Sequence, residues 1–192
     1  FQVRRGEIHG LCGENGAGKS TLMKILSGVY PWGTYEGTIL YEGQELKLGD
    51  RSIRQAIEEG VAIVYQELTL VPNMTVGENV FVGKEPVERG SINWDRLYSD
   101  TRQILTKYHL DIQPQAFVKY LGVGKMQMTE IAKALSYKGT RILIMDEPSA
   151  ALTEAEIEDL FRFIRQLRER GVGIIYISHR MNELQVISDR IT

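Results

Sequence analysis

Cysteine is nearly absent from this chain of 192 residues, which contains Cys12 and no other. A single cysteine cannot form a disulfide within the chain, nor supply the paired thiols of a structural zinc site. A disulfide scaffold and a zinc module are therefore excluded, and a reducing cytoplasm fits best. Long apolar runs are lacking too, since none approaches the roughly 18–20 residues that a helix needs to cross a bilayer.

An excess of charge of one sign is also missing. The chain has 23 Lys and Arg against 25 Asp and Glu, which gives a net charge of −2. This balance does not suit a general polyanion binder, and we expect no nucleic-acid partner. Hydrophobic residues make up 43% and charged residues 25%, as in ordinary globular domains with a buried core.

Five segments predict strands, and the last three are nearly all apolar, which is typical of strands buried on both faces of a parallel sheet. They are Glu7–Cys12, Thr38–Tyr41, Val61–Tyr65, Arg141–Met145 and Val172–Ser178. The clearest helix is Thr153–Arg170, where Thr153 and Glu156 predict a capping box. A strand follows it at once, so residues 141–178 predict a βαβ unit.

Residues 72–135 differ from the rest of the chain. They hold Pro, Gly and Asn breaks and a helix near Asp95–His109, but no apolar strand. We expect a single α/β domain over residues 1–192, with a core of residues 1–71 and 136–192 and an inserted α-helical subdomain of residues 72–135. The first residues resemble an edge strand and the last ones the start of another, so we expect a domain truncated at both ends.

The stretch GENGAGKS matches the phosphate-binding loop pattern (P-loop, or Walker A), with an apolar strand before it and a helix after it. Glycines let backbone N–H groups surround phosphate oxygens, and the start of the helix adds partial positive charge. We expect Lys19 to reach the β- and γ-phosphates and Ser20 to ligate Mg²⁺. The predicted phosphate-binding residues are Gly13, Glu14, Asn15, Gly16, Ala17, Gly18, Lys19, Ser20 and Thr21.

Three other strands are predicted to end in polar side chains. The apolar run RILIM leads into Asp146 and Glu147, at the sheet edge where open α/β sheets bind ligands. We expect Asp146 to hold Mg²⁺ through a water molecule bound to the metal. We expect Glu147 to polarise the water that attacks the phosphate. Gln66 is expected to contact Mg²⁺ and the water, and His179 to hydrogen-bond the γ-phosphate. A lone histidine at a strand end is more often an ordinary surface residue, so that alternative stays open.

The stretch KYLGVGKMQMTEIAKAL, residues 119–135, predicts a helix from its three- and four-residue apolar spacing. Its entry, Gly122-Val123-Gly124, lacks the Ser, Thr, Asp or Asn that normally accepts a hydrogen bond from the first-turn amides. Bare amides at the start of a helix suit an anion. We therefore expect an anion to bind at this entry.

In this order, the P-loop, Gln66, the glycine-led helix at 121–125, Asp146-Glu147 and His179 resemble the ATP-binding subunits of ABC transporters, over essentially the whole chain. Stretches such as YQELTLVPNMTVGENVFVG and YISHRMNEL resemble the first cassette of bacterial monosaccharide importers, the xylose and multiple-monosaccharide types above all. The resemblance implies a P-loop NTPase (RecA-like) core with a mainly parallel sheet. It also implies hydrolysis of ATP with Mg²⁺ to power sugar import.

The same resemblance implies partners: a second cassette in the same polypeptide, transmembrane permease subunits and, indirectly, an extracytoplasmic sugar-binding protein. The location would be the cytoplasmic face of the cell membrane. A soluble ABC ATPase acting on ribosomes or DNA is the alternative. The chain shows neither the long coiled coils of DNA-repair members nor the basic arm usual in translation factors.

In ABC ATPases the signature loop binds the γ-phosphate of ATP held on the other cassette, which by resemblance assigns Gly122, Val123, Gly124 and Lys125 to that contact. Here Gly122 replaces the serine, and Lys125 the glutamine, of the common L-S-G-G-Q. We expect the loop to serve a weaker nucleotide site. The competing view is that Lys125 supplies charge in place of the lost hydroxyl.

Overall fold

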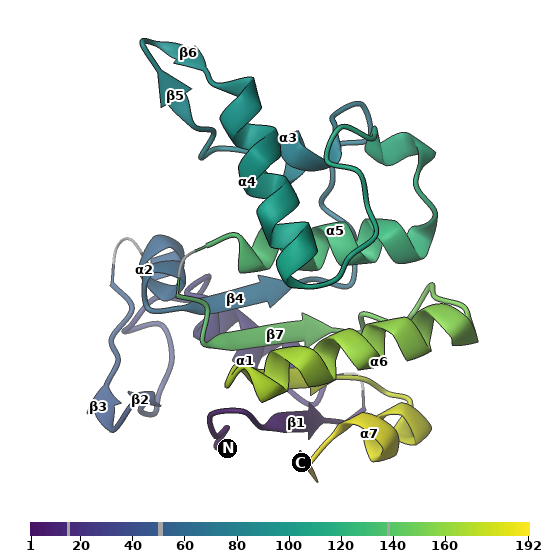
Figure 1. Cartoon of the computed structure of the whole chain (residues 1–192). Coiled ribbons are helices and arrows are strands. Elements are labelled where there is room, and N and C mark those ends of the chain that lie inside the picture. The colour runs from purple at the N-terminus through teal and green to yellow at the C-terminus, as the bar shows by residue number, and fades with distance from the viewer. Residues whose placement is uncertain (15, 50–51, 138) are drawn as a thin grey trace.

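The computed structural model describes residues 1–14, 16–49, 52–137 and 139–192. Its centre is a five-stranded sheet with strand order β4-β7-β8-β1-β9, in which every pairing is parallel. The strands are β1 (Ile8–Leu11), β4 (Val61–Val64), β7 (Ile142–Asp146), β8 (Gly173–Ile177) and β9 (Arg190–Ile191). Their carboxyl ends meet at one edge, on the right in Figure 1, because the strands share one direction.

Both faces of the sheet are covered. On β7, Leu143 and Met145 belong to a core cluster shared with several helices, whereas Ile144 packs in a second cluster with Met23 and Ala56. Successive strand residues point to opposite faces, so this division places helices on each side. The cluster that contains Ile144 includes residues of α1 (Lys19–Leu26) and α2 (Ser52–Glu58). The cluster that contains Leu143 and Met145 includes residues of α3 (Val76–Phe81), α4 (Trp94–Lys107), α5 (Val123–Leu135), α6 (Glu154–Glu169) and α7 (Met181–Ile187).

The predicted α/β fold with a mainly parallel sheet is confirmed, and its four apolar strands differ from prediction by one residue at most at each end. The Thr38–Tyr41 strand is largely wrong. Only β2 (Leu40–Tyr41) forms there, and it pairs antiparallel with β3 (Gln44–Glu45) outside the main sheet. The prediction that the first residues form an edge strand is also wrong, because β1 begins at Ile8 and lies between β8 and β9.

Helix α6 links β7 to the adjacent parallel strand β8, as the predicted βαβ unit requires. Thr153 caps it as predicted: its backbone N–H donates to Glu156 Oε2 at 2.9 Å, and its hydroxyl accepts from the Glu156 N–H at 3.4 Å. Leu160, Ile164 and Leu167 are fully buried along one face. The helix therefore begins at the residue that its capping box specifies.

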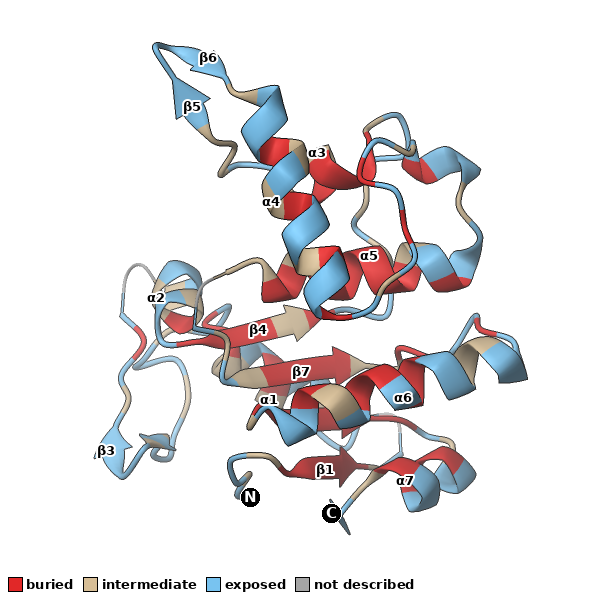
Figure 2. Cartoon of the chain, in the orientation of Figure 1, coloured by how far each residue is buried: buried red, intermediate tan, exposed pale blue. Residues whose placement is uncertain are grey.

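Between β4 and β7, α3 packs against both α4 and α5 on one side of the sheet (Figure 1). The predicted helix Asp95–His109 is confirmed as α4, capped by Asn93, whose side chain accepts from the Arg96 N–H. Figure 2 shows α5 buried over most of its length, while the hairpin of β5 (Val87–Glu88) and β6 (Ser91–Ile92) is exposed. The limits of an inserted subdomain at residues 72 and 135 stay a prediction.

Among the described residues, no helix combines the length and the apolar character needed to span a membrane.

Candidate functional site

The predicted phosphate-binding loop joins β1 to α1. Gly16 and Gly18 adopt left-handed backbone conformations with φ of 90° and 91°, which side chains disfavour. Gly18 caps α1 without any side-chain hydrogen bond, so the first amides of that helix carry no side-chain acceptor. Lys19 Nζ donates to the carbonyls of Gly13 at 2.7 Å and Glu14 at 3.0 Å. The loop therefore places an ammonium group beside the start of a helix, a combination that favours an anion.

The loop is open to solvent. Lys19 is half-buried, and the other described candidates are exposed: Gly13, Glu14, Gly16, Ala17, Gly18, Ser20 and Thr21. The prediction for Asn15 lies outside the described residues. An exposed loop of this kind is accessible to a polyphosphate from solution.

Asp146 is the last residue of β7 and Glu147 follows it. Burial raises the pKa of the Asp146 carboxyl, and the charge of Glu147 raises it further, while Lys19 lowers it. Lys19 therefore lies within electrostatic reach of Asp146. Glu147 has a left-handed backbone with φ of 45°, held by a hydrogen bond from its N–H to the Ile177 carbonyl at 2.9 Å. Such a conformation costs about 1–3 kcal/mol for a residue other than glycine and is typical of functional sites.

Three predicted site residues meet at one carboxylate. Gln66 Nε2 donates to Glu147 Oε2 at 3.4 Å, and His179 Nδ1 lies 2.9 Å from Glu147 Oε1. These residues follow β4, β7 and β8, which are neighbours in the sheet. Parallel pairing thus brings together side chains that are 81 and 32 positions apart in sequence. His179 is not an isolated surface residue, although the chemical roles of all three stay predictions.

The predicted metal ligands Ser20, Gln66 and Asp146 offer a hydroxyl, an amide oxygen and a carboxylate. Mg²⁺ prefers such oxygen donors and is usually held by one or two carboxylates together with substrate phosphates and water. In the described part of the chain, no group of three or more His, Cys, Asp or Glu residues is placed to hold a metal ion. Three oxygen donors, of which one is a carboxylate, fit a Mg²⁺ that arrives with a phosphate ligand.

The glycine-led entry to α5 is only partly as predicted. The helix begins at Val123, and Gly122 caps it without a side-chain hydrogen bond. However, the Gly124 N–H donates to Glu156 Oε1 at 3.0 Å. The expectation of bare amides is therefore wrong at Gly124. The same carboxylate closes the capping box of α6 through its other oxygen, and it approaches so closely that a Cβ at Gly124 would lie 2.6 Å from it.

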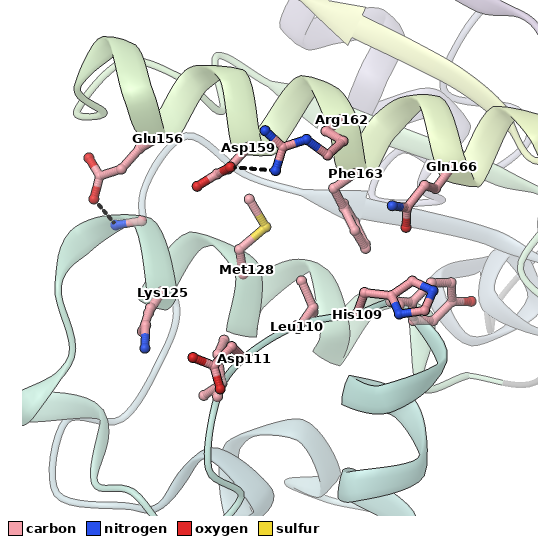
Figure 3. Close-up of a pocket in the computed structure, with 13 residues that line it drawn as sticks. His109, Leu110, Asp111, Lys125, Met128, Glu156, Asp159, Arg162, Phe163 and Gln166 are labelled. Carbon is pink, nitrogen blue, oxygen red and sulfur yellow. Dashed lines mark hydrogen bonds and ion pairs between the residues drawn. The ribbon is translucent and has the colours of Figure 1, made fainter.

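Figure 3 shows this contact at the rim of a cavity of 490 Å³ between α5, α6 and the loop after α4. Lys125 lines the cavity, and Asp159 and Arg162 pair across 2.9 Å on its α6 wall. None of the described P-loop residues lines it, and neither do Gln66, Glu147 and His179. Within the described ranges, no hydrogen bond or ion pair joins residues 122–125 to residues 13–21. The two predicted ATP contacts, the P-loop and the entry of α5, are thus separate sites on this chain.

The sequence predicts no site role for two carboxylates that the structure places in long-range contacts. The sequence predicts Glu156 only as a capping residue, because its hydrogen bond from Gly124 spans 32 positions and has no local sequence pattern. Glu183 lies buried in α7 among hydroxyl groups. No motif or periodicity marks it, because a buried acid in a short helix has the same sequence signature as an exposed one.

Comparisons with known proteins show the family to which the chain belongs. The family model described as ABC transporter matches residues 1–150. A xylose import ATP-binding protein, XylG, of Thermoanaerobacter pseudethanolicus is 55% identical over 100% of this chain, and an L-arabinose transport ATP-binding protein, AraG, of Geobacillus stearothermophilus is 48% identical over 100%. The chain covers 37% of each relative, so it spans just over a third of their length.

Among solved structures, a nucleotide-free ATP-binding cassette from an ABC transporter matches with a TM-score of 0.82. The match covers 100% of this chain and 78% of that one at 23% identity. At this identity the similarity shows the fold alone.

Glu156→Gln is expected to lower the melting temperature by a few degrees at pH 7, because a neutral amide is a weaker acceptor for the Thr153 and Gly124 amides. Hydrogen bonds from Thr153 and Gly124 lower the pKa of Glu156 below its usual value. A lowered folded-state pKa gives stability that is present above the unfolded value and lost as pH falls through the folded one. The difference between variant and wild type should therefore shrink below about pH 4.

Glu154→Gln is the matched control, since Glu154 shares the first turn of α6 and so tests the helix-dipole effect alone. Thermal unfolding of both variants between pH 3 and 7 checks the prediction. An equal loss in the two variants at pH 7 would contradict a role for the Gly124 bond.

Proposed function

Because the chain belongs to the ABC transporter family, we propose that it is the first of two ATP-binding cassettes in a protein that hydrolyses ATP to power monosaccharide import. The proposal rests above all on the meeting of Gln66, Glu147 and His179 beside the P-loop. That arrangement provides a base and two hydrogen-bonding groups next to a phosphate site. The relatives named for xylose and L-arabinose support the sugar class.

In the proposed reaction, the P-loop amides and Lys19 hold the phosphates of ATP. Gln66 orients a water molecule, and Glu147 accepts its proton as the water oxygen attacks the γ-phosphorus. The bond between the γ-phosphorus and the bridging oxygen breaks, which leaves ADP and inorganic phosphate. His179, held against Glu147 at 2.9 Å, hydrogen-bonds the γ-phosphate. A bound Mg²⁺, held by Ser20, Gln66 and Asp146, would neutralise phosphate charge.

The proposed partners follow from the same family membership. A second cassette would bring its own ATP to Gly122, Val123, Gly124 and Lys125 at the entry of α5, where the Gly124 N–H donates to Glu156 in this structure. Transmembrane permease subunits would contact residues 67–83, and an extracytoplasmic sugar-binding protein would deliver the sugar to them. The cassette would work at the cytoplasmic face of the membrane.

Glu147→Gln in the complete protein should retain ATP binding and lose nearly all hydrolysis, because an amide keeps the shape but cannot accept the proton. Lys19→Ala should instead weaken ATP binding, because it removes the charge beside the β- and γ-phosphates. Equilibrium nucleotide binding and phosphate release, measured on both variants, separate the two roles. If both variants lost binding to the same degree, this division of roles would be wrong.

Lys125→Ala should leave kcat of the complete protein within about threefold of wild type if the signature loop serves a weaker site. The competing view, in which Lys125 supplies charge to an active site, requires at least a tenfold loss, about 1.4 kcal/mol of transition-state stabilisation. Lys119→Ala is a suitable control because it removes a nearby exposed lysine. Steady-state hydrolysis of the two variants distinguishes the views.

Val71→Glu should abolish sugar uptake while ATP binding persists, because Val71 is 41% exposed within the proposed permease contact and a charge there would oppose an apolar partner. Leu70 is a poorer choice for substitution, since it packs against the main core cluster. Val87→Glu, at a 64% exposed residue of the β5–β6 hairpin, is the control. Uptake by reconstituted transporter checks the prediction, and normal uptake by Val71→Glu would exclude this contact.

A further inference from the structure

A buried acidic side chain lies behind the proposed catalytic residues. Glu183, in the first turn of α7, is 5% exposed. Its Oε2 accepts hydrogen bonds from the hydroxyls of Ser149 at 2.5 Å and Tyr176 at 3.1 Å, and Ser178 Oγ lies at 3.5 Å. Its Oε1 accepts from Arg180 Nη1 at 2.8 Å. A carboxylate has lone pairs for several such donors, whereas no neutral side chain of this size does.

These donors come from two different segments of the chain. Ser149 lies two residues after Glu147, in the loop that leaves β7. Ser178 and Arg180 flank His179 after the end of β8, and the Arg180 N–H also donates to Ser178 Oγ at 3.0 Å. One carboxylate therefore joins the segment that carries Glu147 to the segment that carries His179. Beyond this cluster, those two side chains meet at a single contact of 2.9 Å.

The charges around Glu183 favour its ionised form. Burial alone raises the pKa of its carboxyl, but the hydrogen bonds from Ser149, Arg180 and Tyr176 outweigh it, so the pKa is lowered. The hydrogen bond and the charge of Glu183 are the main reasons why the pKa of Arg180 is raised, and the charge of Glu147 makes a smaller contribution. The Arg180 guanidinium thus lies within electrostatic reach of both acids. Because Glu183, Ser149 and Tyr176 are buried, breaking a hydrogen bond among them would leave a polar group unsatisfied, which disfavours motion within the cluster.

We infer that Glu183 is a positioning residue for the proposed hydrolysis: through Ser149 on one side, and Ser178 and Arg180 on the other, it holds Glu147 and His179 at contact distance. This inference rests on the proposed function. Glu183 touches neither water nor nucleotide in this role. It acts by limiting the relative motion of two segments, and displacement of reacting groups by about 1 Å can cost up to a hundredfold in rate.

Ser149→Ala in the complete protein tests the inference, because it removes one donor and leaves every charge in place. We expect kcat for ATP hydrolysis to fall about tenfold while KM and the Kd for ATP stay within about twofold, since the P-loop is unchanged. Thr101→Ala is the matched control. It also deletes a fully buried hydroxyl, bonded to the Leu97 carbonyl in α4, and should leave kcat within about twofold at a similar loss of melting temperature.

The double variant with His179→Ala separates positioning from general destabilisation. If Ser149 acts through the Glu147–His179 contact, Ser149→Ala should cost less than about twofold in single-turnover hydrolysis once His179 is absent. The same tenfold loss in both backgrounds, or a kcat no lower than that of Thr101→Ala, would overturn the inference. Glu183→Gln, which keeps the size of the side chain, must show the same loss of kcat at constant KM. A wild-type protein without ATP hydrolysis would instead overturn the proposed function, and this inference with it.

Discussion

The parallel pairing of β4, β7 and β8 is the constraint on which the site depends. Because neighbouring parallel strands end at one edge, Gln66, Glu147 and His179 arrive within hydrogen-bonding distance. The pairing in turn requires two covered faces, and alternate residues such as Leu143 and Ile144 belong to different core clusters. The burial that stabilises the sheet therefore also holds the site together.

Much of this could be predicted from the sequence, because the signals are local. Apolar runs give the central strands, the Thr153–Glu156 spacing gives the start of α6, and the glycine pattern gives the P-loop. The failures concern contacts between distant segments. The bond from Gly124 to Glu156 depends on how closely α5 approaches α6, and the burial of Glu183 depends on where α7 packs. Neither the contact nor the burial can be predicted from hydrophobic periodicity or from a short motif.

The strand predicted at Thr38–Tyr41 failed for a related reason. Its residues have the β-propensity of a strand, but β-propensity largely reflects packing on a half-buried surface. Leu40 is 68% exposed, and the segment pairs with Gln44–Glu45 outside the main sheet. Without a covering layer, each of the two strands is only two residues long.

Glu147 is placed where stability and chemistry oppose each other. Its φ of 45° lies in a region that glycine enters without a steric penalty, so a glycine there would relieve backbone strain. The same exchange would delete the carboxylate that Gln66 and His179 contact. Under the proposed function, stability and hydrolysis therefore favour different residues at this position, a trade-off known for strained active sites. Under the proposed function, the chain accepts a strained backbone at Glu147 in order to keep an acid at the edge of its sheet.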